Sequence, residues 1–400
     1  MLKTLFQSSK GSVYKTQDIQ EYYPFDGKPL MVLINEPIWD MLREHCLYMT
    51  LAITNKCNMR CSVCIMYDKQ GRAPFQELSQ EDVRYVMRKL GRRKKKIVIF
   101  GGEPTLRDDL FEIIRIIKDS GNIPTLYTNG IKLADPDYVK KLSSSGLKKI
   151  FLSIDSLTEK GTEVLQGDKK FLKLKLKALD NLKQYSKIKF WLSSMIAYGV
   201  NHEEISSLIQ KVIEDKSGML KGIYLLAATN TGMSWYQLDA NTVLTIDYIL
   251  NKIEEATDGV LSIEYFKEFT RLKSNLNNVL KRFRARFPYS PDRALVKKLK
   301  DGSIKPVIDP NDIKSINRLI ENGNYFALSK YLIKYNNWIG LLARVFQPEI
   351  VEFEAFHKSE VVFIDPSYMT VTPIHSLLSR GMTNVIKDEQ GFQLYAQGPS

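Results

Sequence analysis

Residues 47–64 read LYMTLAITNKCNMRCSVC, a β-rich run followed at once by three cysteines within eight residues. Residues 97–104 read IVIFGGEP, a second short β-rich run that ends in two glycines, a glutamate and a proline. In parallel α/β folds, ligands bind and reactions occur where the strands end. The sequence therefore predicts that the cysteines and the glycine turn lie at the same edge of one sheet.

Short β-rich runs alternate with helical periods from residue 47 to about residue 258, which is typical of repeated βα units. The candidate strands are residues 47–54, 97–100, 123–128, 149–154, 188–196 and 222–228. Helices are expected to begin near Ser79, Asp108, Asp135, Lys169, His202 and Thr242, several of them at good capping residues. A complete barrel has eight such units. The six found here predict an α/β protein with an open, partial (β/α)6 TIM-like barrel.

This barrel divides the chain into three expected parts. Residues 1–46 form an N-terminal extension, residues 47–258 form the barrel, and residues 259–400 form a mixed C-terminal region that contacts the substrate or acts as a lid. The sequence begins without an apolar signal-peptide region, and its longest uncharged run is too polar to span a bilayer. We therefore expect a cytoplasmic protein.

The three clustered cysteines, Cys57, Cys61 and Cys64, indicate a metal site rather than a disulfide framework. Thiolate is the natural ligand of iron–sulfur clusters, and three thiolates leave one iron of a [4Fe–4S] cluster open. An open iron can chelate the amino and carboxylate groups of S-adenosylmethionine. One electron then breaks the C5′–S bond and gives methionine and a 5′-deoxyadenosyl radical.

A structural zinc site is the alternative, with His45 or Cys46 as a fourth ligand. Zinc sites usually bring their ligands as two paired knuckles, and the sequence holds no second pair. Cys46 has two further interpretations. It is either a thiol that gives a hydrogen atom to a substrate radical, or a small buried hydrophobic residue.

The C-x3-C-x2-C motif followed by Gly-Gly-Glu-Pro, on six βα units, resembles the radical S-adenosylmethionine (radical SAM) superfamily over roughly residues 47–230. The resemblance implies that Cys57, Cys61 and Cys64 ligate the cluster. It implies that the motif Gly101, Gly102, Glu103 and Pro104 binds the amino group of S-adenosylmethionine. It also implies cofactor contacts by residues after the later strands, namely Thr128, Asn129, Ser153, Asp155, Ser194 and Leu226. Val63 departs from the family pattern, which usually has an aromatic residue at this position near the adenine.

A narrower likeness lies in residues 101–157, which read GGEPTLRDDLFEIIRIIKDSGNIPTLYTNGIKLADPDYVKKLSSSGLKKIFLSIDSL. This run resembles enzymes that methylate dihydropterins and enzymes that join archaeal lipid chains into tetraethers. Those relatives tend to carry additional cysteine-rich cluster domains, whereas this sequence has no cysteine after Cys64. We therefore expect a single cluster, reduced by an external one-electron donor of the flavodoxin or ferredoxin type.

The formal net charge of +13 favours an anionic partner. Ten basic residues against one acidic residue lie between Arg271 and Lys300. Within them, Lys281, Arg282, Arg284 and Arg286 alternate with apolar residues, as on a helix that lies on an anionic membrane or on an ordinary solvated helix face. A second segment, residues 326–346, is rich in apolar residues and is expected to be core, a lid or a membrane anchor. We recognise no nucleic-acid-binding module.

These observations favour an enzyme that abstracts a hydrogen atom from an unactivated carbon of a hydrophobic or anionic substrate, such as a lipid or a phosphorylated metabolite. One alternative is an enzyme that modifies a ribosomally made peptide, with residues 1–46 docking the leader segment. The other is a non-catalytic iron–sulfur protein that binds or senses a ligand.

Overall fold

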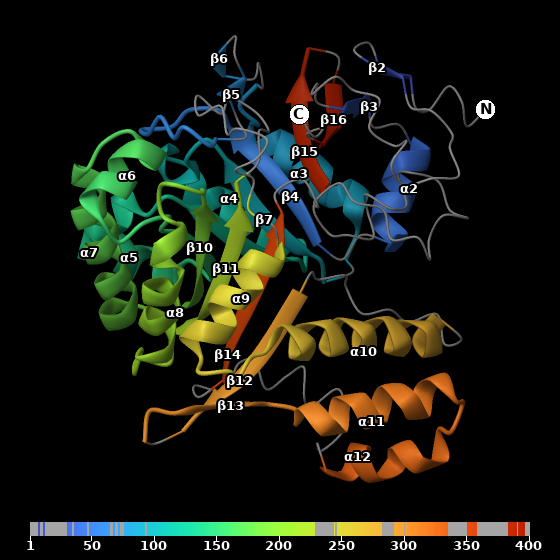
Figure 1. Cartoon of the computed structure of the whole chain (residues 1–400). Coiled ribbons are helices and arrows are strands. Elements are labelled where there is room, and N and C mark those ends of the chain that lie inside the picture. The colour runs from blue at the N-terminus through green and yellow to red at the C-terminus, as the bar shows by residue number, and fades with distance from the viewer. Residues whose placement is uncertain are drawn as a thin grey trace. The chain divides into compact units, whose positions relative to one another are not determined.

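The computed structural model of the chain describes residues 7–8, 11–12, 30–33, 36–45, 48–64, 67–68, 71–72, 76–92, 94–228, 244, 246–281, 292–299, 301–334, 350–357, 383–389 and 391–396 (Figure 1). The chain forms two compact units. The first consists of Met1–Ile188, Ala228–Val243 and His357–Ser400, and the second of Lys189–Ala227 and Leu244–Phe356.

Four parallel strands form the centre of the first unit. In their order across the sheet they are β4 (Tyr48–Thr54), β7 (Lys96–Gly101), β8 (Ile123–Thr128) and β9 (Lys149–Ser153). Leu51 lies opposite Ile99, Ile99 opposite Leu126, and Leu126 opposite Ile150. All four side chains are fully buried. This row joins the four strands through apolar contact, and each side chain contributes about 1.5–3 kcal/mol through burial.

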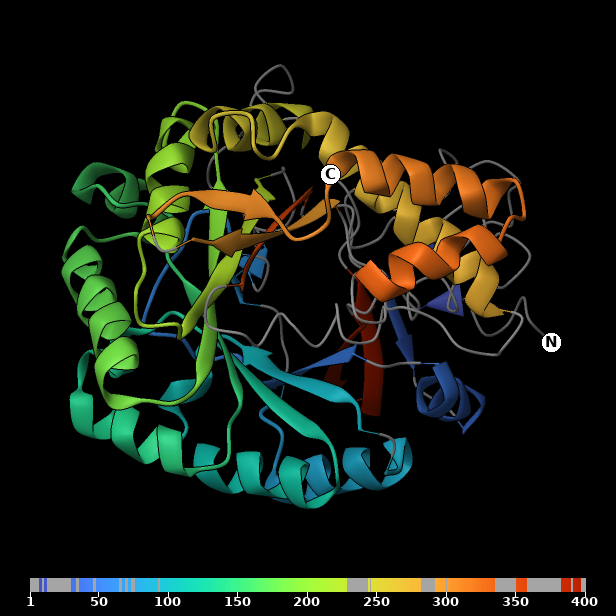
Figure 2. The same cartoon turned by 90° about the horizontal axis from the view of Figure 1, so that it is seen from below.

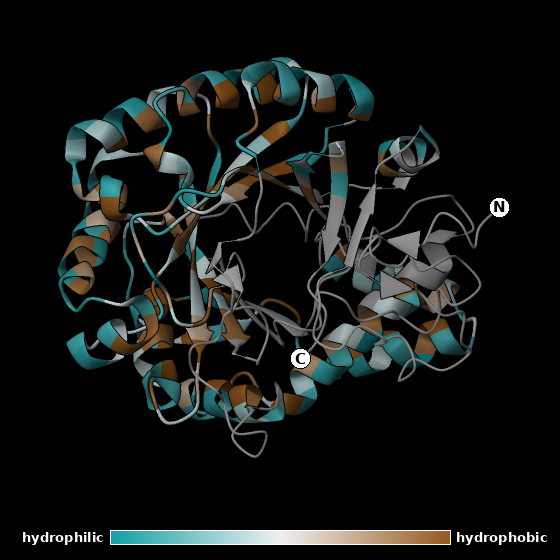
Figure 3. Ribbon diagram, turned by 90° about the horizontal axis from the view of Figure 1, so that it is seen from above, coloured by the Kyte–Doolittle hydropathy of each residue, from teal (hydrophilic) through white to brown (hydrophobic). Residues whose placement is uncertain are grey.

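Five helices follow these strands, and Figure 2 shows them on the outer side of the sheet. They are α3 (Gln80–Leu90), α4 (Leu110–Asp119), α5 (Pro136–Ser144), α6 (Glu159–Gln166) and α7 (Lys170–Tyr185). Two short 3-10 turns, η2 (Pro104–Leu106) and η3 (Ile131–Ala134), precede α4 and α5. Ser79 and Asp82 form the capping box of α3, and Asp135 caps α5 ahead of Pro136. Figure 3 shows hydrophobic and hydrophilic residues alternating along the helices, as amphipathic helices on a sheet require.

Segments from both ends of the chain extend the sheet beside β4. β15 (Thr383–Asp388) pairs in parallel with β4, and β16 (Gly391–Ala396) pairs antiparallel with β15 and with β3 (Leu30–Leu33). Trp39 of α2 (Glu36–His45) packs its ring edge-on against Tyr85 and Phe392, and these two rings stack on each other. The first unit also holds two small hairpins, β1–β2 (Gln7–Ser8 and Gly11–Ser12) and β5–β6 (Tyr67–Asp68 and Gly71–Arg72).

The second unit contains two further parallel strands, β10 (Lys189–Ile196) and β11 (Leu220–Ala227). η4 (His202–Glu204) and α8 (Ile205–Ile213) connect them, and α9 (Ile246–Ala256) and α10 (Ile263–Lys281) come later in the chain. β12 (Asp292–Lys298) pairs antiparallel with β13 (Ile304–Pro306) and β14 (Ile350–His357). α11 (Pro310–Glu321) packs against α10 and is followed by η6 (Phe326–Leu328) and α12 (Ser329–Lys334).

The predicted α/β class is confirmed, and all six predicted βα units are present, as a partial TIM-like barrel requires. Four units lie in the first compact unit and two in the second. The expected domain boundaries at residues 46 and 258 stay a prediction. Within the described ranges, no helix has both the length and the apolarity needed to cross a membrane.

Candidate active site

The three clustered cysteines lie on an irregular loop directly after β4, in the first unit. Cys57, Cys61 and Cys64 are each half-buried, and none of these three forms a disulfide. The Cys64 N–H donates to the carbonyl oxygen of Cys61 at 3.3 Å, which bends the end of the loop back on itself. The loop therefore presents three thiols within eight residues.

The backbone of this loop is held by two neighbouring elements. From the end of β7, the N–H groups of Gly102 and Glu103 donate to the carbonyl oxygens of Thr54 (2.8 Å) and Lys56 (2.7 Å). From the end of α6, the Leu165 carbonyl accepts from the Ser62 N–H at 2.9 Å. These bonds fix both ends of the cysteine loop before any ligand binds.

After β8, Asn129 makes the third connection to the cysteine loop. Its Nδ2 donates to Asn58 Oδ1 at 2.8 Å and lies 4.0 Å from Cys57 Sγ. Its own Oδ1 accepts from the Ile131 N–H at 3.0 Å, so the amide orientation is fixed. Asn129 thus forms the turn that its pairing with Gly130 predicts and also reaches a cysteine.

The two glycines of the Gly-Gly-Glu-Pro turn are needed for close packing against the cysteine loop. A Cβ atom on Gly101 would lie 2.1 Å from the Thr54 carbonyl oxygen, and one on Gly102 would lie 2.1 Å from that of Lys56. Gly101 also has a φ of +134°, which residues with a side chain rarely adopt. The two glycines therefore admit the backbone of residues 54–56 next to the turn.

Glu103 is buried and bridges the ends of β7 and β8. Its Oε1 accepts from Thr105 N (3.0 Å), Thr105 Oγ1 (2.6 Å) and Thr128 Oγ1 (2.7 Å). Its Oε2 accepts from Asn129 N at 2.7 Å. Pro104 follows as the first residue of η2, where the fixed φ of proline suits the start of a helical turn. The structure therefore brings Glu103, Thr128 and Asn129 together, all three of which the sequence singles out.

At the end of β9 the structure adds a residue that the sequence analysis missed. Lys175 of α7 is buried, and its Nζ donates to the Ser153 carbonyl oxygen at 2.7 Å. Nearby, Asp155 Oδ2 accepts from Gln166 Nε2 at 2.6 Å. Lys175 lies four residues from both Phe171 and Leu179 and so falls on the apolar face of α7. A lysine at an apolar position of a helical pattern was the available signal.

Charge and burial act together on these groups. Burial is the largest cause that raises the pKa of the Cys61 thiol. The negative charges of Cys64, Asp155 and Cys57 raise this pKa further, and the positive charge of Lys175 lowers it. The thiols of the loop, the Lys175 ammonium and the Asp155 carboxylate are therefore close enough to influence one another.

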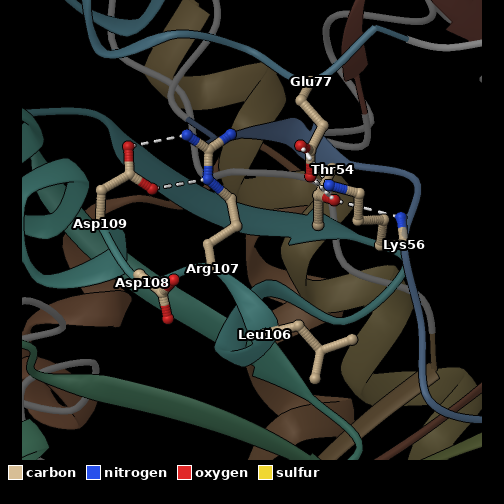
Figure 4. A pocket seen from close by; sticks show the side chains of 7 residues that line it. All are labelled: Thr54, Lys56, Glu77, Leu106, Arg107, Asp108 and Asp109. Carbon is tan, nitrogen blue, oxygen red and sulfur yellow. Dashed lines mark hydrogen bonds and ion pairs between the residues drawn. The ribbon is translucent and has the colours of Figure 1, made fainter.

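A pocket of about 280 Å³ opens beside the start of the cysteine loop (Figure 4). It is lined by Thr54, Lys56, Glu77, Leu106, Arg107, Asp108 and Asp109. Arg107 donates from Nε and Nη2 to Asp109 at 2.8 Å each, and this pairing holds the pKa of the Asp109 carboxyl below its usual range. The lining contains none of the three cysteines, so this pocket neighbours the cysteine site and is not part of it.

The remaining predicted residues are placed as follows. Ser194 lies on β10 and Leu226 on β11, both in the second unit. Val63 is buried in the cysteine loop. Cys46 and Arg282–Arg286 lie outside the described residues, as do the side chains of His45 and Lys281. In the segment 326–346, Tyr331 is buried and Phe326 is 92% exposed, and the residues from 335 onward are not described.

Residues 51–212 match the family described as the radical SAM superfamily. The match runs from β4 into α8 and includes the three cysteines and the Gly-Gly-Glu-Pro turn. Residues 51–212 of this chain are thus a radical SAM domain.

Individual radical SAM relatives resemble only part of the chain. The 7,8-dihydro-6-hydroxymethylpterin dimethyltransferase of Methanocaldococcus jannaschii is 34% identical over 223 residues, which are 54% of this chain and 42% of the relative. A GTP 3',8-cyclase of Shewanella denitrificans is 30% identical over 163 residues, which are 40% of this chain and 47% of the relative. The chain thus spans less than half the length of these two curated relatives. The solved structure of Streptococcus suis SuiB shares 17% identity and a TM-score of 0.45, over 54% of this chain and 47% of that one.

Radical SAM proteins use a [4Fe–4S] cluster and S-adenosylmethionine, and the donor chemistry of this site fits both. The thiols of one short, anchored loop are the ligands that such a cluster takes. Within the described ranges, no group of three or more His, Cys, Asp or Glu side chains is already arranged as a metal site.

Proposed function

We propose that this protein is a radical SAM enzyme that holds one [4Fe–4S] cluster on Cys57, Cys61 and Cys64. The observation that carries the proposal is the anchoring of the cysteine loop by the Gly-Gly-Glu-Pro turn and Asn129. The two motifs lie about forty residues apart in the sequence, and hydrogen bonds join them into one site.

The cluster, once bound, supplies the electron that cleaves S-adenosylmethionine to methionine and a 5′-deoxyadenosyl radical. The work of the protein is to orient the cofactor and exclude water. Glu103 suits the binding of an ammonium group because, among the described residues, Oε1 accepts three hydrogen bonds and Oε2 accepts one. An oxygen of a carboxylate carries two lone pairs, and Oε2 uses one of them for the Asn129 N–H, so Oε2 can accept from one more donor.

The neighbours of Glu103 complete the proposed cofactor site. Thr128 and Asn129 hold its carboxylate in place, while Ser153 and Asp155 at the end of β9 are proposed to contact the cofactor's ribose and carboxylate. Gly101, Gly102 and Pro104 set the shape of the turn, and Ser194 and Leu226 remain proposed contacts from β10 and β11.

The proposed substrate is a hydrophobic or anionic molecule from which the radical takes a hydrogen atom. The names of the relatives give a dihydropterin and GTP as substrates. GTP is a phosphorylated metabolite, and this favours a phosphorylated metabolite over a lipid. A flavodoxin or ferredoxin is the proposed electron donor.

The test is anaerobic incubation of the reconstituted protein with S-adenosylmethionine and dithionite. We expect 5′-deoxyadenosine to form with the wild-type protein and not with the Cys57→Ala, Cys61→Ala, Cys64→Ala variant. Absence of 5′-deoxyadenosine from a wild-type protein that carries the cluster would show that it is a binding or sensing protein instead.

A further inference from the structure

Lys175 is a buried basic residue to which the proposed function assigns no role. It lies on α7 among buried apolar residues such as Phe171, Leu172 and Leu179, and only 1% of its surface is exposed. Four other lysines of the same helix, at positions 170, 173, 177 and 183, are not buried. Burial is thus particular to position 175 and not a property of this lysine-rich helix.

The hydrogen bonds of the Lys175 ammonium are only partly filled. An ammonium group has three N–H donors. Within the part of the chain that the structure describes, Nζ makes one hydrogen bond, to the Ser153 carbonyl oxygen at 2.7 Å. Buried ammonium groups normally have their donors filled or are paired with an anion. Two donors of the ammonium group are therefore available for an anionic partner.

Several acidic groups act on the Lys175 ammonium. Burial lowers the pKa of Lys175, and four acidic groups oppose this shift: first Asp155, then Cys61, Glu103 and Cys57. Two of the four are proposed cluster ligands. The packing of the loop agrees, because a Cβ atom on Gly167, between α6 and α7, would lie 3.1 Å from the Arg60 carbonyl oxygen.

We propose that Lys175 is a positioning residue whose buried ammonium stabilises the negative charge of the cluster-bound cysteines and thereby raises the reduction potential of the cluster. This inference rests on the proposed function. Reduction adds one negative charge to the cluster, so a nearby fixed cation favours the reduced form. Net charge and hydrogen bonds near the sulfurs are established determinants of such potentials.

The experiment is a redox titration of the anaerobically reconstituted protein without S-adenosylmethionine, followed by electron paramagnetic resonance. Lys175→Met removes the charge and keeps the length of the side chain. We expect the equilibrium constant for one-electron reduction to fall at least about tenfold, which corresponds to a potential about 59 mV lower. Lys175→Arg retains the charge and is expected to keep the potential near that of the wild type.

A matched control is Lys95→Met. Lys95 is also fully buried, and its Nζ also donates to a main-chain carbonyl, that of Arg43 at 2.8 Å. It precedes β7, however, and so lies at the opposite end of the strands from the cysteines. We expect Lys95→Met to lower stability as Lys175→Met does and to leave the potential unchanged.

An equal reduction potential in the wild type and in Lys175→Met would overturn the inference. If the variant at the same time bound S-adenosylmethionine more weakly, the ammonium group would pair with the cofactor instead. If Lys175→Met takes up no iron, the neutral, polar variant Lys175→Gln is titrated with the same expected shift. Failure of the proposed function is separate, because it appears in the wild type as a missing cluster or missing 5′-deoxyadenosine.

Discussion

At the scale of single residues, Glu103 has a structural task and a proposed ligand-binding task. Four donors from Thr105, Thr128 and Asn129 converge on its buried carboxylate. This network holds the end of β7 against the end of β8. The remaining acceptor site on Oε2 is the part proposed to receive the amino group of S-adenosylmethionine.

We predict that Glu103→Gln lowers the affinity for S-adenosylmethionine about ten- to a hundredfold. The reason is the loss of one charge-assisted hydrogen bond, worth about 1.5–3 kcal/mol, at about 1.4 kcal/mol for each factor of ten. The variant is also expected to be less stable, because the new amide group cannot accept from all the donors around it. Calorimetric titration of the reconstituted protein measures the affinity.

Thr105→Val is the control for that experiment. Thr105 is buried, and its hydroxyl donates to Glu103 Oε1 at 2.6 Å. Its removal costs about 1 kcal/mol of stability but leaves the carboxylate and its Oε2 atom in place. Similar affinity in Glu103→Gln, Thr105→Val and the wild type would restrict Glu103 to its structural task.

At the scale of elements, the turn after β7 and the loop after β4 are joined by backbone hydrogen bonds and pack directly against each other. Gly102 contributes an N–H to the Thr54 carbonyl and leaves no space for a side chain. Any residue larger than glycine must push away the backbone that leads into Cys57.

We predict that Gly102→Ala destabilises the protein by about 1–3 kcal/mol through overpacking and lowers its iron content after reconstitution. Gly121→Ala is the matched control. Gly121 has a φ of +83°, and among the described residues its Cβ would meet only the Arg92 carbonyl oxygen, at 4.0 Å. The control therefore carries backbone strain of about 1–2 kcal/mol without a clash near the cysteines. Equal iron content in the two variants would contradict the proposed coupling of turn and loop.

The helices and strands that could be predicted are those marked by residues within or next to the element itself, such as capping residues and apolar runs. The capping box of Ser79 and Asp82 and the Asp135–Pro136 start both appear where expected. The six parallel strands appear within about two residues of their predicted ends, since apolar runs and turn residues are local features. α6 was missed, and its packing on the cysteine loop, through Ser62 and Leu165, depends on residues a hundred positions apart.

At the scale of the whole molecule, the limit of sequence reasoning is pairing over long distances. Strand β3 from the N-terminal part of the sequence and strands β15 and β16 from the C-terminal part complete the edge of the sheet beside β4 in the first unit. These two parts lie more than three hundred residues apart, and no periodicity or motif links them. The same limit applies to Lys175, whose proposed role depends on the contact between its Nζ on α7 and the Ser153 carbonyl oxygen at the end of β9.

The central claim is that the three cysteines hold an iron–sulfur cluster that serves S-adenosylmethionine chemistry. Iron and zinc analysis of the anaerobically reconstituted protein tests it most directly. We predict about four irons per chain for the wild type, with the broad absorption of thiolate-bound iron, and neither for the Cys57→Ala, Cys61→Ala, Cys64→Ala variant. A colourless wild-type protein that retains about one zinc per chain after reconstitution would contradict the account.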